Sequence, residues 1–562
     1  MLKGGFFVKI KKIMIQKFFH SETKSISSAS LILAVSYLLS AVLGLMRDRL
    51  LAGTFGAGNE LDVYYTAFTV PDFVALILIF GAISAAVIPI FSSYLLKSKE
   101  EAFRYLSTLL NVFLGFLIII CVILMVFAPF LVSLIAPGFL GEKKELAVLL
   151  MRIMFLSPII LGASNMISGI LQVFHRFLIT ALSPLLYNLG IIIGILFFVP
   201  AWGLAGLAWG VVLGGVLHLS VQLPALFVSG FKYRLSFNLK DPGILKTIKL
   251  MLPRSLGLGA GQLNTIATTA IASTLMAGSI AVFNLANNLS SILVNAIAVS
   301  VSTASFPSMS LAFLKDDGED FLRKFSGILR QIIFLTLPIS FLLLILRAQI
   351  VRVVLGAGKF DWGDTKLTTA CLGILALNLI AQAFIIFLSK TFYAAHNTKI
   401  PAIISGLTVA FNIGLSLFLV WLLNFSESFN FFLQNILRLG GVKNMGVIGL
   451  ALAYSITAIL EAGLLLYMFI KKFPKLQTKE ISASFYKTLI ATLAMAVFTI
   501  LTRQILGSVL SLQTFWGIFL QLALSGIVAL VTYVGVSFYL KSAELKTISD
   551  SLLKKFLYAG KY

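Results

Sequence analysis

The chain has 562 residues, of which 59% are hydrophobic and 12% are charged, and its mean hydropathy is +1.02. A soluble domain carries about 25% charged residues, so this composition excludes a water-soluble protein. Since one helical crossing of a membrane needs roughly 20 apolar residues, the sequence predicts an all-α polytopic membrane protein. A β-barrel is disfavoured because its strands alternate polar and apolar residues.

Apolar runs between charged breaks predict about 14 transmembrane helices. Their centres lie near residues 38, 78, 119, 160, 188, 215, 264, 296, 337, 379, 412, 458, 496 and 527. We interpret the basic leader as a helix on the membrane surface or as a disordered tail. The predicted parts are a cytoplasmic leader (1–28), an N-terminal lobe of helices one to six (29–230), a C-terminal lobe of helices seven to twelve (231–475), a hydrophobic pair of helices thirteen and fourteen (476–541) and a cytoplasmic tail (542–562).

The two predicted lobes repeat short motifs in the same order. Residues 203–208 (GLAGLA) resemble residues 446–451 (GVIGLA), and the Asn-Leu-Gly that starts at Asn188 resembles the Asn-Ile-Gly that starts at Asn412. Pro89 ends the second predicted span as Pro307 ends the eighth. The offset of six spans makes the repeats parallel. Transporters built from repeats place their substrate between the lobes and alternate its access to the two sides.

The basic residues predict the orientation of the chain in the membrane. The formal net charge is +23, from 44 Lys+Arg and 21 Asp+Glu. With the N-terminus in the cytoplasm, the cytoplasmic segments hold 31 basic residues and the outer loops hold 12. Both termini are therefore predicted to be cytoplasmic. Because these residues lie in short turns between apolar runs, we expect no nucleic-acid partner.

Cysteine and histidine give no sign of a cofactor site. Cys121 and Cys371 both fall inside apolar runs, which predicts no disulfide framework, and the four histidines lack metal-ligand spacing. We therefore expect no metal and no cofactor. No nucleophile and base are paired in any predicted span, so an enzyme is the least favoured class.

Ionisable residues inside a span cost about 2.5–3.5 kcal/mol each, so they are candidate functional groups. Arg47 and Asp48 end the first span, and Asp62 and Asp72 flank the second. One interpretation is a polar site at the outer mouth of a cavity, where Arg47 binds an anion through paired hydrogen bonds. The other is an interfacial Arg–Asp pair that fixes the turn.

Two further ionisable residues have alternative interpretations. Arg254 follows Pro253 at the start of the seventh span, and it either extends to the cytoplasmic interface or supplies a cavity cation. Glu461 lies in the middle of the twelfth span. It is either a proton or sodium coupling site or a neutral acid bonded to a neighbouring helix.

Amide side chains form a polar stripe on the eighth span. Asn284, Asn288 and Asn295 follow helical spacing, and Asn264 and Gln262 lie on the seventh span. Such a stripe lines a hydrated cavity or joins helices; we favour the cavity.

Several motifs together resemble the MurJ/MviN family of lipid II flippases, in the multidrug/oligosaccharidyl-lipid/polysaccharide exporter superfamily. The opening resemblance is VLGLMRD (42–48), FGAG (55–58), Asp62, AFTVP (67–71), Gly81 and Pro89. Later motifs are APGF (136–139), GILQ (169–172) with RF (176–177), Pro184 with Asn188, GKF (358–360) with DT (364–365), and FYA (392–394) with NTK (397–399) and Pro401. They span about residues 30 to 470 in family order.

This resemblance implies a lipid II flippase that moves an undecaprenyl-pyrophosphate-linked peptidoglycan precursor from the inner to the outer leaflet of the bacterial cytoplasmic membrane, for cell wall synthesis. Arg47 inherits the headgroup-binding role, and Asp48 and Asp62 match motif positions. We expect gating or structural roles for the glycines and prolines of the opening motifs, which are Gly44, Gly56, Gly58, Pro71, Gly81 and Pro89.

The sequence departs from the family in its cavity charges. The family's second arginine in helix one aligns with Ala41, and its helix-two arginine and glutamate align with Ala75 and Phe80. The helix-eight pair aligns with Asn288 and Ser291, which join the candidate substrate-binding residues. Either Arg47, Arg254 and amides bind the pyrophosphate, or the substrate has changed.

The alternative functions are an exporter of another polyprenyl-linked glycan or of small amphiphiles, and a non-transporting scaffold for wall synthesis. We expect a polyprenyl-linked lipid and membrane lipids as binding partners, cell-wall synthesis proteins as candidates, and a monomer. Membrane potential, sodium or protons are candidate energy sources.

Overall fold

The structure is a computed structural model that describes residues 26–80, 86–315, 317–442, 445–476, 478–547 and 549–550. The side chains of residues 26–31, 78–80 and 252–260 lie outside this description. Every regular element within the described residues is a helix, which confirms the all-α class. The predicted leader falls almost wholly outside the described residues.

Eleven of the described helical stretches are long and apolar enough to cross a membrane. They coincide with eleven of the predicted spans. The other three predicted spans fall on α2, on the stretch from α3 to α4, and on α13, which are not among those eleven. The count of fourteen therefore stays a prediction, whereas a multi-pass helical membrane protein is confirmed.

The chain forms two compact units, Met1–Ala277 and Gly278–Tyr562. Helix α13 contacts α3 and η1 and belongs to the first unit, although the sequence places it at the start of the C-terminal lobe. The predicted lobe limits stay a prediction. The helices of the first unit are α2 (Ile26–Phe55), α3 (Asn59–Val74), η1 (Ala75–Phe80), α4 (Ile88–Leu95), α5 (Lys99–Val126), α6 (Ala128–Ile135), α7 (Gly141–Met154), α8 (Leu156–Val173), α9 (Phe177–Ile193), η3 (Gly194–Phe198), α10 (Val199–Trp202), α11 (Leu204–Ser220), α12 (Leu223–Val228) and α13 (Pro242–Ser273).

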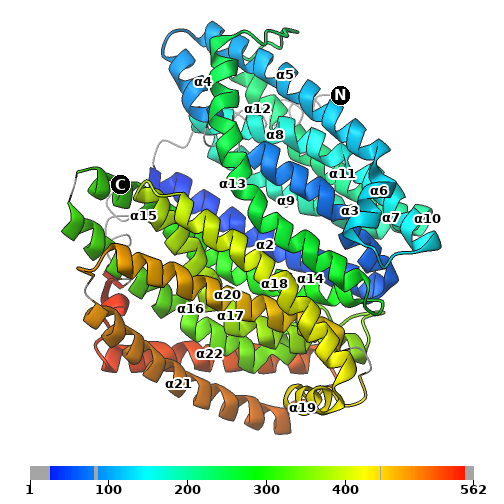
Figure 1. Cartoon of the computed structure of the whole chain (residues 1–562), viewed down its shortest axis with the longest axis vertical. Helices are drawn as coiled ribbons and strands as arrows, with labels where there is room; N and C mark the ends of the chain where they lie inside the picture. Colours follow the sequence, from blue (N-terminus) through cyan, green and yellow to red (C-terminus); the bar gives the residue numbers. More distant parts are fainter. Residues whose placement is uncertain are drawn as a thin grey trace, which may run out of the picture. The chain divides into compact units, whose positions relative to one another are not determined.

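Glycines bring α9 and α11 into backbone contact at the centre of the first unit (Figure 1). A Cβ atom on Gly190 would lie 2.3 Å from the Cα of Gly214, and one on Gly194 would lie 2.5 Å from the Cα of Gly210. Small residues four apart let membrane helices approach this closely. Helix α2 packs on α9, so the close pair supports the helix that carries Arg47.

In the second unit the helices pack in the order α18, α20, α17 and α16, and α16 contacts both α21 and α22 (Figure 1). The bounds of its helices are α14 (Ser279–Val294), η4 (Asn295–Val299), α15 (Ser300–Leu314), α16 (Gly318–Val354), α17 (Trp362–Ala394), α18 (Lys399–Phe425), α19 (Glu427–Leu437), α20 (Gly446–Lys472), α21 (Thr478–Val509) and α22 (Phe515–Tyr539).

The second and eighth predicted spans share an irregularity. Each contains a π-helical segment, η1 or η4, ahead of the proline that the repeat identifies, Pro89 or Pro307. π turns are rare and are often found at functional sites. The matching positions support a structural repeat between these two spans.

Candidate functional site

The side chain of Arg47 is held by a carboxylate and an amide. Its Nε and Nη2 donate to Oδ1 of Asp48 at 3.1 and 2.8 Å, and its Nη1 donates to Oδ1 of Asn188 at 3.1 Å. The side chain of Asp48 is 3% exposed and that of Arg47 is 23% exposed. The acid is therefore enclosed, and one side of the guanidinium stays accessible. The structure is compatible with both interpretations of Arg47: the Arg47–Asp48 ion pair forms, and the exposed part of the arginine can make a further contact.

Asn188 connects α9 to α2 on both sides of its amide. Its Oδ1 accepts from Arg47, and its Nδ2 lies 3.3 Å from Oγ of Ser40 and 3.3 Å from the carbonyl oxygen of Pro184. Asn188 is 9% exposed. Because a buried amide must satisfy both its donor and its acceptor, these bonds fix the position of Arg47.

Asp62 pairs with a lysine from another helix. Its Oδ2 accepts from Nζ of Lys143 at 3.2 Å, and its side chain is 3% exposed. The ammonium of Lys143 also lies 4.1 Å from the ring centre of Phe139, within the range of a cation–π interaction. This pair joins the start of α3 to the start of α7.

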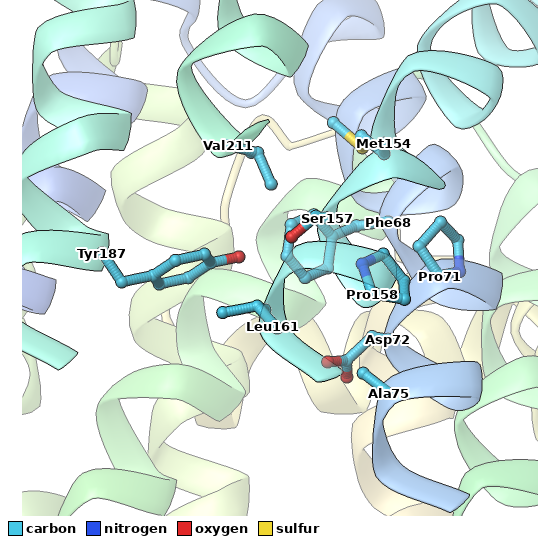
Figure 2. Close-up of a pocket in the computed structure, with 10 residues that line it drawn as sticks. All are labelled: Phe68, Pro71, Asp72, Ala75, Met154, Ser157, Pro158, Leu161, Tyr187 and Val211. Carbon is cyan, nitrogen blue, oxygen red and sulfur yellow. The ribbon is translucent and has the colours of Figure 1, made fainter. Parts of the chain in front are cut away.

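A small pocket lies between α3, η1, α7, α8, α9 and α11 (Figure 2). Its lining includes Asp72, Ala75, Ser157 and Tyr187, and the hydroxyl of Tyr187 points into it. The volume is about 20 Å³, which suits a water molecule rather than a sugar or a pyrophosphate. This pocket alone therefore cannot hold a lipid headgroup.

Ala75 places a small apolar side chain in the lining of the pocket. The resemblance places a family arginine at this position, next to Asp72, and here a methyl group stands in its place. Asp72 accepts a long hydrogen bond of 3.4 Å from Nε2 of Gln262 on α13. The amide of Gln262 therefore lies beside this acid, and the use of amides in place of charges stays a prediction.

The asparagine stripe lies on the more exposed face of α14. Asn284, Asn287, Asn288 and Ser291 are half-buried and Asn295 is exposed, whereas the neighbouring Leu285 and other residues of the opposite face are buried. Nδ2 of Asn284 donates to the carbonyl oxygen of Ile280 in its own helix. The Oδ1 atom of Asn264 on α13 is buried and has no partner among the described residues. Partial exposure of four neighbouring polar groups agrees with a hydrated surface.

Glu461 accepts hydrogen bonds from two hydroxyl groups of α18. Oγ of Ser405 lies 2.6 Å from its Oε1, and Oγ1 of Thr408 lies 3.1 Å from its Oε2. Within the described residues this carboxylate makes no ion pair. Two carboxylate oxygens with hydroxyl neighbours are oxygen donors that suit a proton or a hard cation.

The turn between the first two spans needs its glycine. Gly56 has a φ of 68°, a left-handed conformation that side chains disfavour. Pro71 lies inside α3 and Pro89 lies in the first turn of α4. An added Cβ would meet no atom within 4 Å at Gly44 and none closer than 3.7 Å at Gly58, so space does not explain either glycine. The side chain of Arg254 and all of Gly81 lie outside the described residues.

Sequence reasoning missed the partners of the site. Asn188 was recognised only as a motif residue, Lys143 only as a loop charge, and Tyr187 not at all. The repeated Asn-X-Gly motif was the available signal for Asn188, because a polar residue inside a span usually has a partner. Nothing in the sequence pattern indicates the distance between Lys143 and Asp62.

The comparisons with known proteins agree with one another. The family profile described as lipid II flippase MurJ matches residues 51–520. The probable lipid II flippase MurJ of Buchnera aphidicola subsp. Acyrthosiphon pisum (strain APS) is 30% identical over 505 residues, covering 88% of this chain and 94% of that protein. The lipid II flippase MurJ of Burkholderia cenocepacia is 29% identical over 373 residues, or 65% of this chain and 73% of that protein.

Two solved structures place the fold. A lipid II flippase MurJ in an inward closed conformation matches with a TM-score of 0.72 and 25% identity, covering 91% of this chain and 99% of that one. An inward-facing multidrug resistance transporter of the MATE family, in the MOP superfamily, matches with a TM-score of 0.62 and 17% identity, covering 79% of this chain and 99% of that one. The second likeness concerns the fold alone.

Proposed function

Since the chain belongs to the MurJ family, we propose that it is a lipid II flippase of the bacterial cytoplasmic membrane. It moves the undecaprenyl-pyrophosphate-linked peptidoglycan precursor from the inner to the outer leaflet by alternating access. The observation that carries the proposal is the family match over residues 51–520, which begins four residues after Arg47 and includes its partner Asn188 and most of both units. The protein acts as a transporter of a lipid-linked substrate and not as an enzyme.

Arg47 is the proposed contact for the pyrophosphate. Three of the five N–H groups of a guanidinium are engaged by Asp48 and Asn188, which leaves donors on the accessible side. Asp48 holds the guanidinium in place, so little ordering is needed when a phosphate oxygen arrives. Paired, charge-assisted hydrogen bonds make this an effective phosphate contact.

The remaining candidates complete the path of the headgroup. Asn288 and Ser291 offer amide and hydroxyl groups where the family carries charges, and Arg254 supplies a second cation. Asp62, through its pair with Lys143, holds α3 against α7. In this proposal the chain binds the headgroup with fewer charged contacts than the family pattern provides. Because amide contacts are weaker than charged ones, each of them contributes less to binding.

The proposed energy source is the membrane potential. An inside-negative potential favours outward movement of an anion by about 2.3 kcal/mol per charge per 100 mV. Glu461 is the candidate for a coupled proton or sodium ion, because its two oxygens face hydroxyl donors and no cation among the described residues. Both termini are proposed to lie in the cytoplasm, and the working unit is proposed to be a monomer that also meets cell-wall synthesis proteins.

Translocation of fluorescent lipid II in proteoliposomes tests the proposal. Wild type and Arg47→Ala are compared at an imposed potential, with Arg152→Ala, an arginine of another helix, as a matched loss of charge. We expect transport by wild type and Arg152→Ala and a loss of at least about tenfold in Arg47→Ala, since a charged hydrogen bond contributes about 1.5–3 kcal/mol.

Other outcomes separate the alternatives. Folded wild type that moves another polyprenyl-linked glycan but not lipid II would contradict the cargo. Full transport by Arg47→Ala would remove Arg47 from the path. A wild type that moves no lipid at all would favour a scaffold role.

A further inference from the structure

Three arginines of the second unit interact with one another. Arg347 lies near the end of α16, Arg503 near the end of α21, and Arg438 directly after α19. Nζ of Lys366 on α17 donates to the carbonyl oxygen of Gly440 at 3.0 Å, so the segment that carries Arg438 lies against α17. Electrostatic interactions join Arg347 to both of the others and Arg503 to Arg438. Among the described residues, no carboxylate is one of the charged groups that act on Arg347 or Arg503. We call these three residues the arginine cluster.

The fold holds the cluster in place from two sides. Nη1 of Arg503 donates to the carbonyl oxygen of Ile345 at 2.7 Å, which ties α21 to α16. The side chain of Arg347 lies over Gly373 of α17, where an added Cβ would be 2.8 Å from its Cδ and 3.0 Å from its Nη1. Within the described residues Arg347 makes no hydrogen bond and no ion pair. Its half-buried guanidinium therefore has unused donors next to two like charges.

The acidic residues on the same predicted side are engaged at helix N-termini. On the side of the second unit predicted to be outside, the sequence has seven basic residues and three acidic ones. Two of the acids, Asp361 and Asp364, form the capping box at the start of α17, and Glu427 lies in the first turn of α19. Like charges that interact in a region of low dielectric repel one another strongly unless an anion lies between them.

The helices that follow Arg347 and Arg503 in the chain, α17 and α22, both have an exposed tryptophan in their first turn. Trp362 and Trp516 are 60% and 66% exposed, and tryptophan gathers at the level of lipid headgroups. Beside Arg438, α19 exposes Phe432 and Ile436, which share one face of this short helix. In Figure 1, α19 lies at the same end of the unit as the end of α21. The charges are therefore flanked by apolar side chains that suit lipid tails.

We propose that Arg347, Arg503 and Arg438 bind the phosphate of an anionic lipid headgroup, in the leaflet that the charge distribution predicts to be the outer one. Three guanidinium groups provide paired donors for phosphate oxygens, and the exposed apolar residues hold the acyl chains. The site tethers α19 and α21 to the same lipid. The proposal concerns a lipid of the membrane and does not depend on which substrate is transported.

Binding of dioctanoyl-phosphatidylglycerol to the purified full-length protein in detergent tests this site. Native mass spectrometry measures the affinity of wild type, Arg347→Gln, Arg438→Gln and Lys359→Gln, with dioctanoyl-phosphatidylcholine as the zwitterionic comparison. Lys359 is an exposed lysine of the same predicted outer side, so it is the control for lost charge. Arg438 is exposed as well, so its variant keeps the test valid if Arg347→Gln fails to fold.

We expect phosphatidylglycerol to bind more tightly than phosphatidylcholine. Arg347→Gln and Arg438→Gln should each weaken its binding by at least about tenfold, and Lys359→Gln by less than about twofold. Arg347→Lys should recover only part of the affinity, because lysine lacks the planar fork.

Two results would overturn the proposal. The first is equal affinity for the two lipids, or equal losses in Lys359→Gln and the cluster variants. The second is full displacement of phosphatidylglycerol by inorganic phosphate at the same concentration as the lipid, which would mean that the cluster binds a free anion and that the acyl chains contribute nothing.

Discussion

The two units carry the same asparagine motif on related helices, and they use it differently. In the first unit, the acceptor of Asn188 receives Arg47 and its donor reaches α2. In the second unit, the acceptor of Asn412 receives Ser416 of its own helix, and its Nδ2 is buried without a partner among the described residues. The hydrogen-bonded group described in the first unit contains the cation Arg47, whereas the group described in the second unit contains the acid Glu461. A repeated helical framework can therefore hold a basic group in one half and an acidic group in the other.

The glycines of the repeated motif give the largest expected difference. In Gly190→Ala the new Cβ would lie 2.3 Å from the backbone of Gly214, which has no flexible side chain to move aside. In Gly414→Ala it would meet no atom within 4 Å. We expect Gly190→Ala to lower the free energy of unfolding by about 3 kcal/mol and Gly414→Ala to change it by less than about 0.5 kcal/mol. Thermal unfolding of both variants in detergent measures this, and equal shifts would contradict the difference in packing.

The asparagines themselves give a smaller difference. Asn188→Leu leaves an N–H group of Arg47 without its acceptor and should cost about 2 kcal/mol of unfolding free energy. Asn412→Leu removes a donor that is already unpaired, so its cost should stay below about 1 kcal/mol. The same unfolding measurement distinguishes them. A larger loss in Asn412→Leu would show that this residue has a partner that we have not identified.

Glu461 gives the smallest expected effect on stability and a sharp effect on coupling. Glu461→Gln keeps an oxygen for Ser405 or Thr408, so the unfolding free energy should change by about 1 kcal/mol or less. If this acid couples transport to an ion, lipid translocation driven by a sodium or proton gradient should fall to the level seen without a gradient. Transport driven by potential alone should persist. Unchanged gradient dependence would exclude Glu461 as the coupling group, and Glu427→Gln, an exposed acid, is the matched control.

Much of the fold could be predicted from the sequence because apolar length and periodicity determine membrane helices. Eleven predicted spans coincide with described helices of sufficient length. The family was also predicted from its motifs and is confirmed by the profile match. The other three predicted spans, around α2, η1 and α13, contain charges, prolines and glycines of the candidate site.

The site was less predictable because its contacts join residues far apart in the chain. Arg47 was identified from its position in a span, but its bond to Asn188 crosses 141 residues. The pair of Lys143 with Asp62 crosses 81. Charge in a loop says nothing about which acid it will meet, and the exchange of a family arginine for Ala75 becomes meaningful only when the pocket beside Asp72 is seen.

The π segments η1 and η4 each directly follow a regular helix, α3 or α14, and add one residue to a helical turn. A π turn closes its hydrogen bonds over five residues instead of four, so the extra residue can in principle pass from one turn to the next. Each residue that such a step crosses would rotate by about 100° around the helix axis and shift by about 1.5 Å along it. Asp72 lies just before η1, and Asn295 lies within η4. A one-residue slip would therefore turn a polar side chain from one face of its helix to another, while the backbone hydrogen bonds of the crossed residues are broken and made again.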